Sequence, residues 1–197
     1  MQIEKSPPLL LASTSRYRAE LLARLGIAFT AVAPDVDEAA RPGESAERLA
    51  RRLALAKAEA VASLYPAAWV IGSDQVASCD GQLLGKPGTQ QKAIEQLLLM
   101  RGKSTVFLTG LAVVNTGKRL SYRSVDTTVV KLRRLSLAEI ERYVLSEPSF
   151  DCAGSAKIEG LGISLCSEVQ SRDPTALIGL PLIDTARLLR KAGFVLP

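Results

Sequence analysis

The chain of 197 residues contains no histidine. This absence excludes every mechanism in which an imidazole activates a serine or cysteine nucleophile. It also excludes every metal site with an imidazole ligand. A metal ion bound by this sequence must take oxygen ligands, which favours Mg²⁺ or Mn²⁺, the usual companions of phosphate groups.

Cysteines and long apolar runs are also scarce. The three cysteines, Cys79, Cys152 and Cys166, lack metal-ligand spacing. Residues 1–5 lack the basic and apolar regions of a secretory signal, so we expect free thiols in a reducing, cytoplasmic setting. Apolar runs such as residues 97–100 are far below the roughly 18 residues of a membrane span, and no membrane partner is expected.

Aromatic residues make up only 5% of the chain, while the net charge is +5. A protein that binds nucleic acid usually combines a dense basic stripe with aromatic side chains that stack on bases. The composition therefore disfavours nucleic acid and favours a small phosphorylated ligand, although a solvated basic surface explains the charge equally well.

Apolar patterning predicts an α/β protein that forms one domain over residues 1–197. Strands and helices alternate, but a long hairpin in the middle indicates a mixed sheet rather than a purely parallel one. The expected strands cover residues 8–12, 28–33, 69–72, 105–115, 120–132 and 163–169. The expected helices cover residues 18–25, 45–64, 89–100, 136–145 and 181–192.

The first candidate site is the segment Ser13-Thr14-Ser15, which lies between an expected strand and an expected helix. A helix N-terminus presents unpaired N–H groups to an anion, and Ser13 and Ser15 add hydroxyl donors. Arg18, in the first turn, adds a forked cation that fits phosphate. An ordinary serine-capped helix with solvated arginines remains the alternative.

Two further candidates follow along the chain. Residues 35–38 form the densest acidic cluster and end in Glu38, although such runs are usually solvated loops. Lys57 lies at the edge of the apolar stripe of a long helix, so it either extends to water or reaches a phosphate in a cleft. The sequence favours neither outcome for Lys57.

The strongest candidate is Asp74, which we expect directly after a buried strand, where α/β sheets place their sites. The turn Gly85-Lys86-Pro87 fixes Lys86 nearby, so the pair offers a metal ligand or base and a phosphate clamp. A plain strand end and hairpin would look the same. Residues 153–160 form a glycine-rich loop that lets the backbone approach a ligand, but they are not a dinucleotide fingerprint.

Taken in order, these segments resemble the Maf family of nucleotide pyrophosphatases over residues 9–189. The resemblance implies two lobes around a deep cleft, as in Maf and ITPase folds, a homodimer, and metal-dependent release of pyrophosphate from nucleotides. It implies that Asp74 accepts a proton and that Glu38 shares the metal with it. The phosphate-binding residues implied in this way are Ser13, Arg18, Lys57 and Lys86, to which the helix N-terminus adds Ser15. The matching pieces are Leu11-Ala12-Ser13-Thr14-Ser15, Val36-Asp37-Glu38, Ala56-Lys57-Ala58, Gly72-Ser73-Asp74, Gly85-Lys86-Pro87, Cys152-Ala153-Gly154, Glu159-Gly160 and Gly179-Leu180-Pro181-Leu182.

Three positions depart from the commonest family pattern: Tyr17, Gln75 and Glu159. An aromatic residue, Gln and Glu in these places resemble the branch that acts on 7-methyl-GTP. Methylation at N7 leaves guanine cationic, and an aromatic face attracts a cation while a carboxylate accepts from guanine's N–H groups. The alternatives are a dTTP or UTP pyrophosphatase of the same family, or a non-catalytic nucleotide-binding regulator of septum formation.

Overall fold

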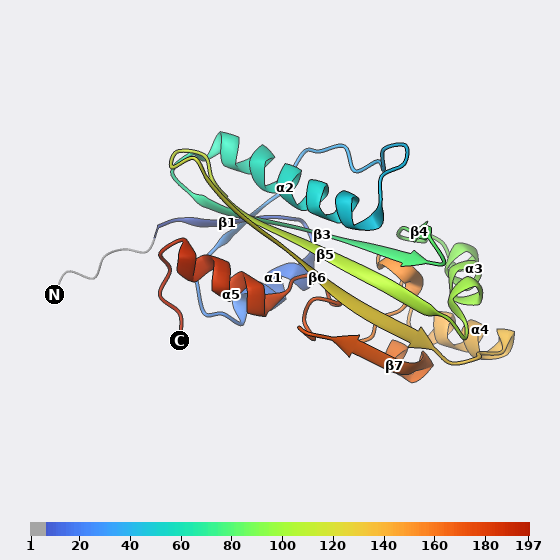
Figure 1. Ribbon diagram of the computed structural model, residues 1–197. Helices are drawn as coiled ribbons and strands as arrows, with labels where there is room; N and C mark the ends of the chain where they lie inside the picture. Colours follow the sequence, from blue (N-terminus) through green and yellow to red (C-terminus); the bar gives the residue numbers. More distant parts are fainter. Residues whose placement is uncertain (1–6) are drawn as a thin grey trace.

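The computed structural model describes residues 7–197 of the chain (Figure 1). The expectation about a secretory signal falls on residues 1–5, which lie outside this range. Among the described residues, no helix combines the length and the apolar character needed to cross a membrane.

The chain folds as a mixed α/β structure, as predicted. The helices α1 to α5 span Arg16–Ala23, Ala46–Leu64, Gln90–Met100, Leu137–Ser146 and Leu182–Lys191. The strands β1 to β7 span Leu9–Ala12, Thr30–Val32, Trp69–Cys79, Gln82–Leu84, Ser104–Asn115, Leu120–Leu132 and Cys166–Ser171. All seven strands belong to one sheet of order β2-β1-β3-β5-β6-β7, and β4 pairs with β3. Strand β1 runs parallel to β2 and β3, and the other pairings are antiparallel.

One edge of β3 is partly open. Its other edge pairs with β5 continuously from Val70 to Cys79. On the open side, β1 pairs with residues 69–71 and β4 pairs with residues 77–79. Within the part of the chain that the structure describes, residues 72–76 therefore have no strand beside them on this edge, which leaves room for a ligand.

Alternating side chains build a core on each face of the sheet. Leu9 and Leu11 of β1 point to one face, where they join apolar residues of α1 and α5. Leu10 and Ala12 point to the other face and join residues of α2. Figure 1 shows α2 lying along one face of the long strands, with α1 and α5 on the opposite face. A further cluster, at the end of the sheet near α3 and α4, packs those helices against β3, β4 and β6.

Two glycines let α2 lie unusually close to the sheet. A Cβ atom on Gly72 would be 2.2 Å from the carbonyl oxygen of Ala54, and one on Gly110 would be 2.3 Å from that of Ala50. Neither distance is possible for a real side chain, so glycine is required at both positions. Because α2 lies this close, its side chains reach the residues of β3 and β5 that neighbour Gly72 and Gly110.

The structure corrects several predicted boundaries. Strand β3 does not end at Gly72 but continues to Cys79, so Asp74 lies inside a strand rather than after one. The polar run Ser73-Asp74-Gln75 stays in the strand because pairing with β5 covers all of it. Helix α1 begins at Arg16 rather than Arg18. Residues 163–165 form a 3₁₀ turn, and β7 starts only at Cys166.

Candidate active site

A cavity of about 760 Å³ surrounds the open edge of β3. Its walls come from the start of α1, the acidic loop after β2, α2, β3, the turn after β4, and residues 151–159 and 177–179. All ten residues singled out in the sequence line this one cavity: Ser13, Ser15, Tyr17, Arg18, Glu38, Lys57, Asp74, Gln75, Lys86 and Glu159. The structure thus brings them together, while the role of each remains a prediction.

Lys57, a residue of α2, joins two carboxylates of the site. It is 5% exposed, so it does not extend to water. Its Nζ atom is 2.6 Å from Oδ1 of Asp74 and 2.6 Å from Oε1 of Glu38. The two carboxylates come from different elements, and the shared ammonium holds both against the open strand edge. This geometry depends on the close approach that Gly72 and Gly110 allow.

The two carboxylates can also offer oxygens to a cation. Among residues 7–197, no hydrogen bond reaches Oδ2 of Asp74 or Oε2 of Glu38. No group of three or more acidic or cysteine side chains in that range could hold a metal by itself. Mg²⁺ commonly takes one or two carboxylates and completes its shell with water and substrate phosphates. The pair therefore fits a hard divalent cation that binds together with a phosphorylated ligand.

Arg18 joins the start of α1 to a distant loop. Its Nε donates to the carbonyl oxygen of Gly179 at 2.9 Å, and one terminal nitrogen is 3.3 Å from Oγ of Ser13. Ser15 caps α1 by accepting from the backbone N–H of Arg18. The predicted cap is therefore present, and the hydroxyl hydrogen of Ser15 remains available to a ligand.

The charged side chains of the cavity shift the pKa values of Glu38 and Arg18. Burial disfavours ionisation of Glu38, but the hydrogen bond and charge of Lys57, with the charges of Lys86 and Arg18, outweigh it and lower the pKa of Glu38. Burial lowers the pKa of Arg18, while Asp74 and Glu38 act in the opposite direction. The carboxylates therefore face a group of three cations, which is the arrangement needed to hold a metal-bound polyphosphate.

The loop that carries Glu38 is fixed from α2. Arg52 makes two contacts with Glu44, Nε to Oε1 at 2.7 Å and Nη2 to Oε2 at 2.8 Å, and also donates to the carbonyl oxygen of Ala39. The hydrogen bond from Arg52, together with the backbone N–H of Arg41, lowers the pKa of Glu44 to about 2. Glu38 thus belongs to an anchored segment rather than to a free solvated loop.

The residues predicted to select the base come from three elements: Tyr17 from α1, Gln75 from β3 and Glu159 from the loop after residue 155. Tyr17 has two cations close to its ring: the guanidinium of Arg16, 4.9 Å from the centroid, and Nζ of Lys157, 5.8 Å from it. Tyr17 is therefore already in contact with positive charge, which no pattern in the sequence indicates. Glu159 is exposed on the cavity wall, so its carboxylate is accessible to a ligand.

Gln75 has a fixed amide group. Its Nε2 donates to the carbonyl oxygens of Ala176 and Leu177, both at 2.9 Å, and to the hydroxyl of Thr109 at 3.1 Å. Carbonyl oxygens only accept, so the amide must present its nitrogen to them. Within residues 7–197, no hydrogen bond reaches Oε1 of Gln75, which leaves an acceptor on a side chain that lines the cavity.

Several residues of the cavity wall had no role predicted from the sequence. Phe107, Asp151, Cys152 and residues 177–179 contribute to it. Burial, assisted by the charge of Asp151, raises the pKa of Cys152 to about 12, so this free cysteine stays a neutral thiol and not a nucleophile. The turn residues Gly179-Leu180-Pro181 could have indicated a structured loop, but nothing local shows that it reaches Arg18 or Gln75.

The fold and this cavity define an α/β protein with a carboxylate pair and a set of cations at an open strand edge. Residues 8–192 match the Maf-like protein family, and the chain belongs to that family.

Curated relatives agree with this assignment. A protein named 7-methyl-GTP pyrophosphatase from Xanthomonas axonopodis pv. citri is 56% identical over 191 residues, covering 97% of this chain and 100% of that protein. A protein of the same name from Pseudomonas aeruginosa is 50% identical, with the same coverage of both chains. Among solved structures, the Staphylococcus aureus Ham1 protein is similar with a TM-score of 0.49 and 16% identity, over 64% of this chain and 72% of that one.

Proposed function

We propose that this protein hydrolyses a nucleoside triphosphate to the monophosphate and pyrophosphate, and that 7-methyl-GTP is its preferred substrate. The observation that carries the proposal is the cluster of Lys57, Asp74 and Glu38 in a cavity that also holds Arg18 and Lys86. Membership of the Maf-like family and the names of relatives 50–56% identical support it.

Asp74 is the proposed general base. The reaction needs water to attack the α-phosphorus while the bond to the bridging oxygen of the pyrophosphate breaks. A group near that water must take its proton, and no histidine exists to do so. A carboxylate offers about four acceptor positions, and Lys57 takes one of them on Oδ1, so Asp74 keeps positions both for this proton and for a cation.

Glu38 and Asp74 would hold the divalent metal, Mg²⁺ or Mn²⁺. When bound, such an ion neutralises phosphate charge and favours attack on phosphorus. Ser13, Ser15 and Arg18 would bind phosphate oxygens at the start of α1. Lys86, which is exposed on the cavity wall and makes no ion pair among residues 7–197, would close on the phosphates from the other side.

Tyr17, Gln75 and Glu159 would select the base. Guanine presents N–H donors, which suit the acceptors on Gln75 and Glu159, and the N7 methyl group adds the positive charge that a carboxylate prefers. Since Arg16 and Lys157 already lie near the Tyr17 ring, the ring has less attraction left for another cation. We therefore expect Glu159 to contribute more to the discrimination than Tyr17.

A panel of canonical and modified triphosphates, assayed for pyrophosphate release with Mg²⁺, tests the proposal. We expect kcat/KM for 7-methyl-GTP to exceed that for GTP, and Glu159→Gln to narrow this ratio more than Tyr17→Ala. We also expect Asp74→Asn to lower turnover by about 10²–10⁴-fold. Preference for dTTP or UTP would contradict the base assignment, and normal turnover by Asp74→Asn would contradict the mechanism.

Two further features stay predictions, the homodimer and the cytoplasmic location. Light scattering of the purified protein tests the first, with an expected mass of twice 21.1 kDa.

A further inference from the structure

One loop, residues 172–181 between β7 and α5, supplies three backbone carbonyl groups to side chains of the cavity. Ala176 and Leu177 accept from the amide of Gln75. The carbonyl oxygen of Gly179 accepts from Nε of Arg18 at 2.9 Å and from the hydroxyl of Ser73 at 3.1 Å. The position of this loop therefore sets the orientation of side chains that lie more than 100 residues away in the sequence.

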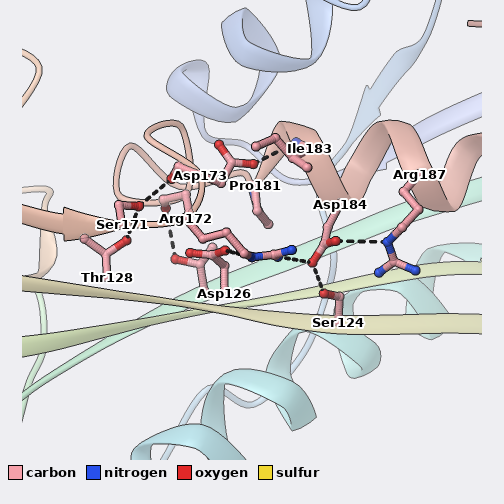
Figure 2. Close-up of polar contacts among 12 residues, drawn as sticks. Ser124, Asp126, Thr128, Ser171, Arg172, Asp173, Pro181, Ile183, Asp184 and Arg187 are labelled. Carbon is pink, nitrogen blue, oxygen red and sulfur yellow. Dashed lines mark hydrogen bonds and ion pairs between the residues drawn. The ribbon is translucent and has the colours of Figure 1, made fainter.

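A single buried carboxylate closes the loop. Asp173 is 1% exposed. Its Oδ1 accepts from the backbone N–H of Thr175 at 2.9 Å and from the Thr175 hydroxyl at 2.6 Å. Its Oδ2 accepts from the backbone N–H of Ile183, in the first turn of α5, at 2.7 Å (Figure 2). Asp173 thus ties the beginning of the loop to the helix that follows it.

Neighbouring groups hold Asp173 itself in place. The hydroxyl of Ser171 donates to the Asp173 carbonyl oxygen at 2.7 Å and lies 2.8 Å from the hydroxyl of Thr128. Arg172 contacts two buried carboxylates, Asp126 at 3.2 Å and Asp184 at 2.8 Å (Figure 2). The cavity lining includes none of these described residues, so the network lies behind the wall, and the loop is the part of it that supplies carbonyl groups to side chains of the site.

We infer that Asp173 is a positioning residue for base selection, acting through the carbonyl groups of Ala176 and Leu177 on the amide of Gln75. With the loop in place, Nε2 faces the carbonyls and Oε1 remains an acceptor for the N–H groups of guanine. A loop free to shift would let the amide rotate and present its donors to the base instead. The inference rests on the proposed function, because it requires Gln75 to contact the base.

The kinetic test uses two variants that each remove part of the contact between Asp173 and Thr175. Asp173→Asn keeps the shape and removes one acceptor oxygen, and Thr175→Val keeps the shape and removes the hydroxyl. Each should lower the ratio of kcat/KM for 7-methyl-GTP to that for GTP by about three- to tenfold, the worth of one neutral hydrogen bond. In a Gln75→Ala background, neither should lower the ratio further, because the group they orient is gone.

Ser124→Ala is the matched control. It removes the contact with Asp184 from the same buried network but touches neither the loop nor Gln75, so the ratio should not change. If Asp173→Asn and Thr175→Val lower kcat/KM equally for both substrates and leave the ratio unchanged, the role of Asp173 is merely structural and the inference is overturned.

A spectroscopic test separates this inference from the proposed function. The side-chain amide signal of Gln75, identified by its loss in Gln75→Ala, should exchange with solvent slowly in the wild type and faster in Asp173→Asn. An unchanged signal in Asp173→Asn and Thr175→Val would overturn the positioning role whatever the substrate. A changed signal would support positioning of the amide even where the wild type shows no preference for 7-methyl-GTP, a result that contradicts the base assignment alone.

Discussion

Replacing Lys57 with methionine removes the charge that two carboxylates share while keeping the length of the side chain. From the sequence, Lys57 could have been a surface lysine, whose replacement changes the free energy of unfolding by less than about 0.5 kcal/mol. The structure predicts a larger effect, since Nζ lies 2.6 Å from both carboxylates and the side chain of Asp74 is only 11% exposed.

The magnitude follows from what the substitution leaves behind. Removing one partner of a buried ion pair typically destabilises a protein by roughly 3–5 kcal/mol. The side chain of Glu38 is 56% exposed, so water can solvate it after the loss, and we expect about 2–3 kcal/mol instead. For a domain of this size, that corresponds to a fall in melting temperature of about 4–12 °C.

Thermal melts followed by circular dichroism at pH 7 with EDTA measure this change. Lys86→Met is the control, because Lys86 is exposed and its loss should shift the free energy of unfolding by less than about 0.5 kcal/mol. Adding Asp74→Asn to Lys57→Met should restore part of the stability by removing the uncompensated carboxylate. A Lys57→Met protein that melts with the wild type would refute the reasoning.

Three further predictions concern the framework of the site. Gly110→Ala should destabilise the fold by about 3 kcal/mol or more, because its Cβ would overlap an α2 carbonyl oxygen. Gly85→Ala is the control and should leave stability unchanged, because a Cβ there meets no described atom within 4 Å. Chemical denaturation of both variants measures the two effects. Glu44→Gln should lose stability relative to the wild type at pH 7. Because the pKa of Glu44 is lowered from 4.5 to about 2, the difference in unfolding free energy between wild type and variant should be complete above pH 4.5 and vanish as the pH falls toward 2. Urea unfolding at successive pH values measures this difference, and a difference that persists in acid would contradict the prediction. Arg172→Met should lower the melting temperature, and by a smaller amount in acid. Burial raises the pKa of Asp126, so its protonated form stabilises the fold at low pH, and this contribution is lost as the pH rises through the folded-state pKa. Arg172 therefore matters most where Asp126 is ionised. A deficit independent of pH would contradict that account.

The sequence was sufficient to identify ten residues of the cavity wall. Ser13 and Ser15 follow a strand and begin a helix, and that local pattern predicts the cap that the structure contains. The resemblance to a family then placed Asp74, Lys57 and Glu38 together, although they come from three separate elements. In the structure, Nζ of Lys57 lies 2.6 Å from a carboxylate oxygen of Asp74 and of Glu38.

Other features depend on contacts that no local pattern records. The polar residues 73–75 suggested the end of a strand, because the sequence does not show that β5 pairs with them. A helical wheel placed Lys57 at an edge, but its burial depends on two glycines in other elements. Gln75 and Leu177 are 102 positions apart, so the orientation of the amide could not be predicted.

The alternation of side chains along β3 has a consequence for how the substrate range of such a protein can change. Asp74 and Gln75 are adjacent in sequence, yet a strand directs successive side chains to opposite faces. Asp74, proposed for bond cleavage, and Gln75, proposed for base choice, thus point to opposite faces of the same strand. With these proposed roles, a substitution at Gln75 would change base recognition while the Lys57–Asp74 pair, on the other side of the strand, keeps its geometry.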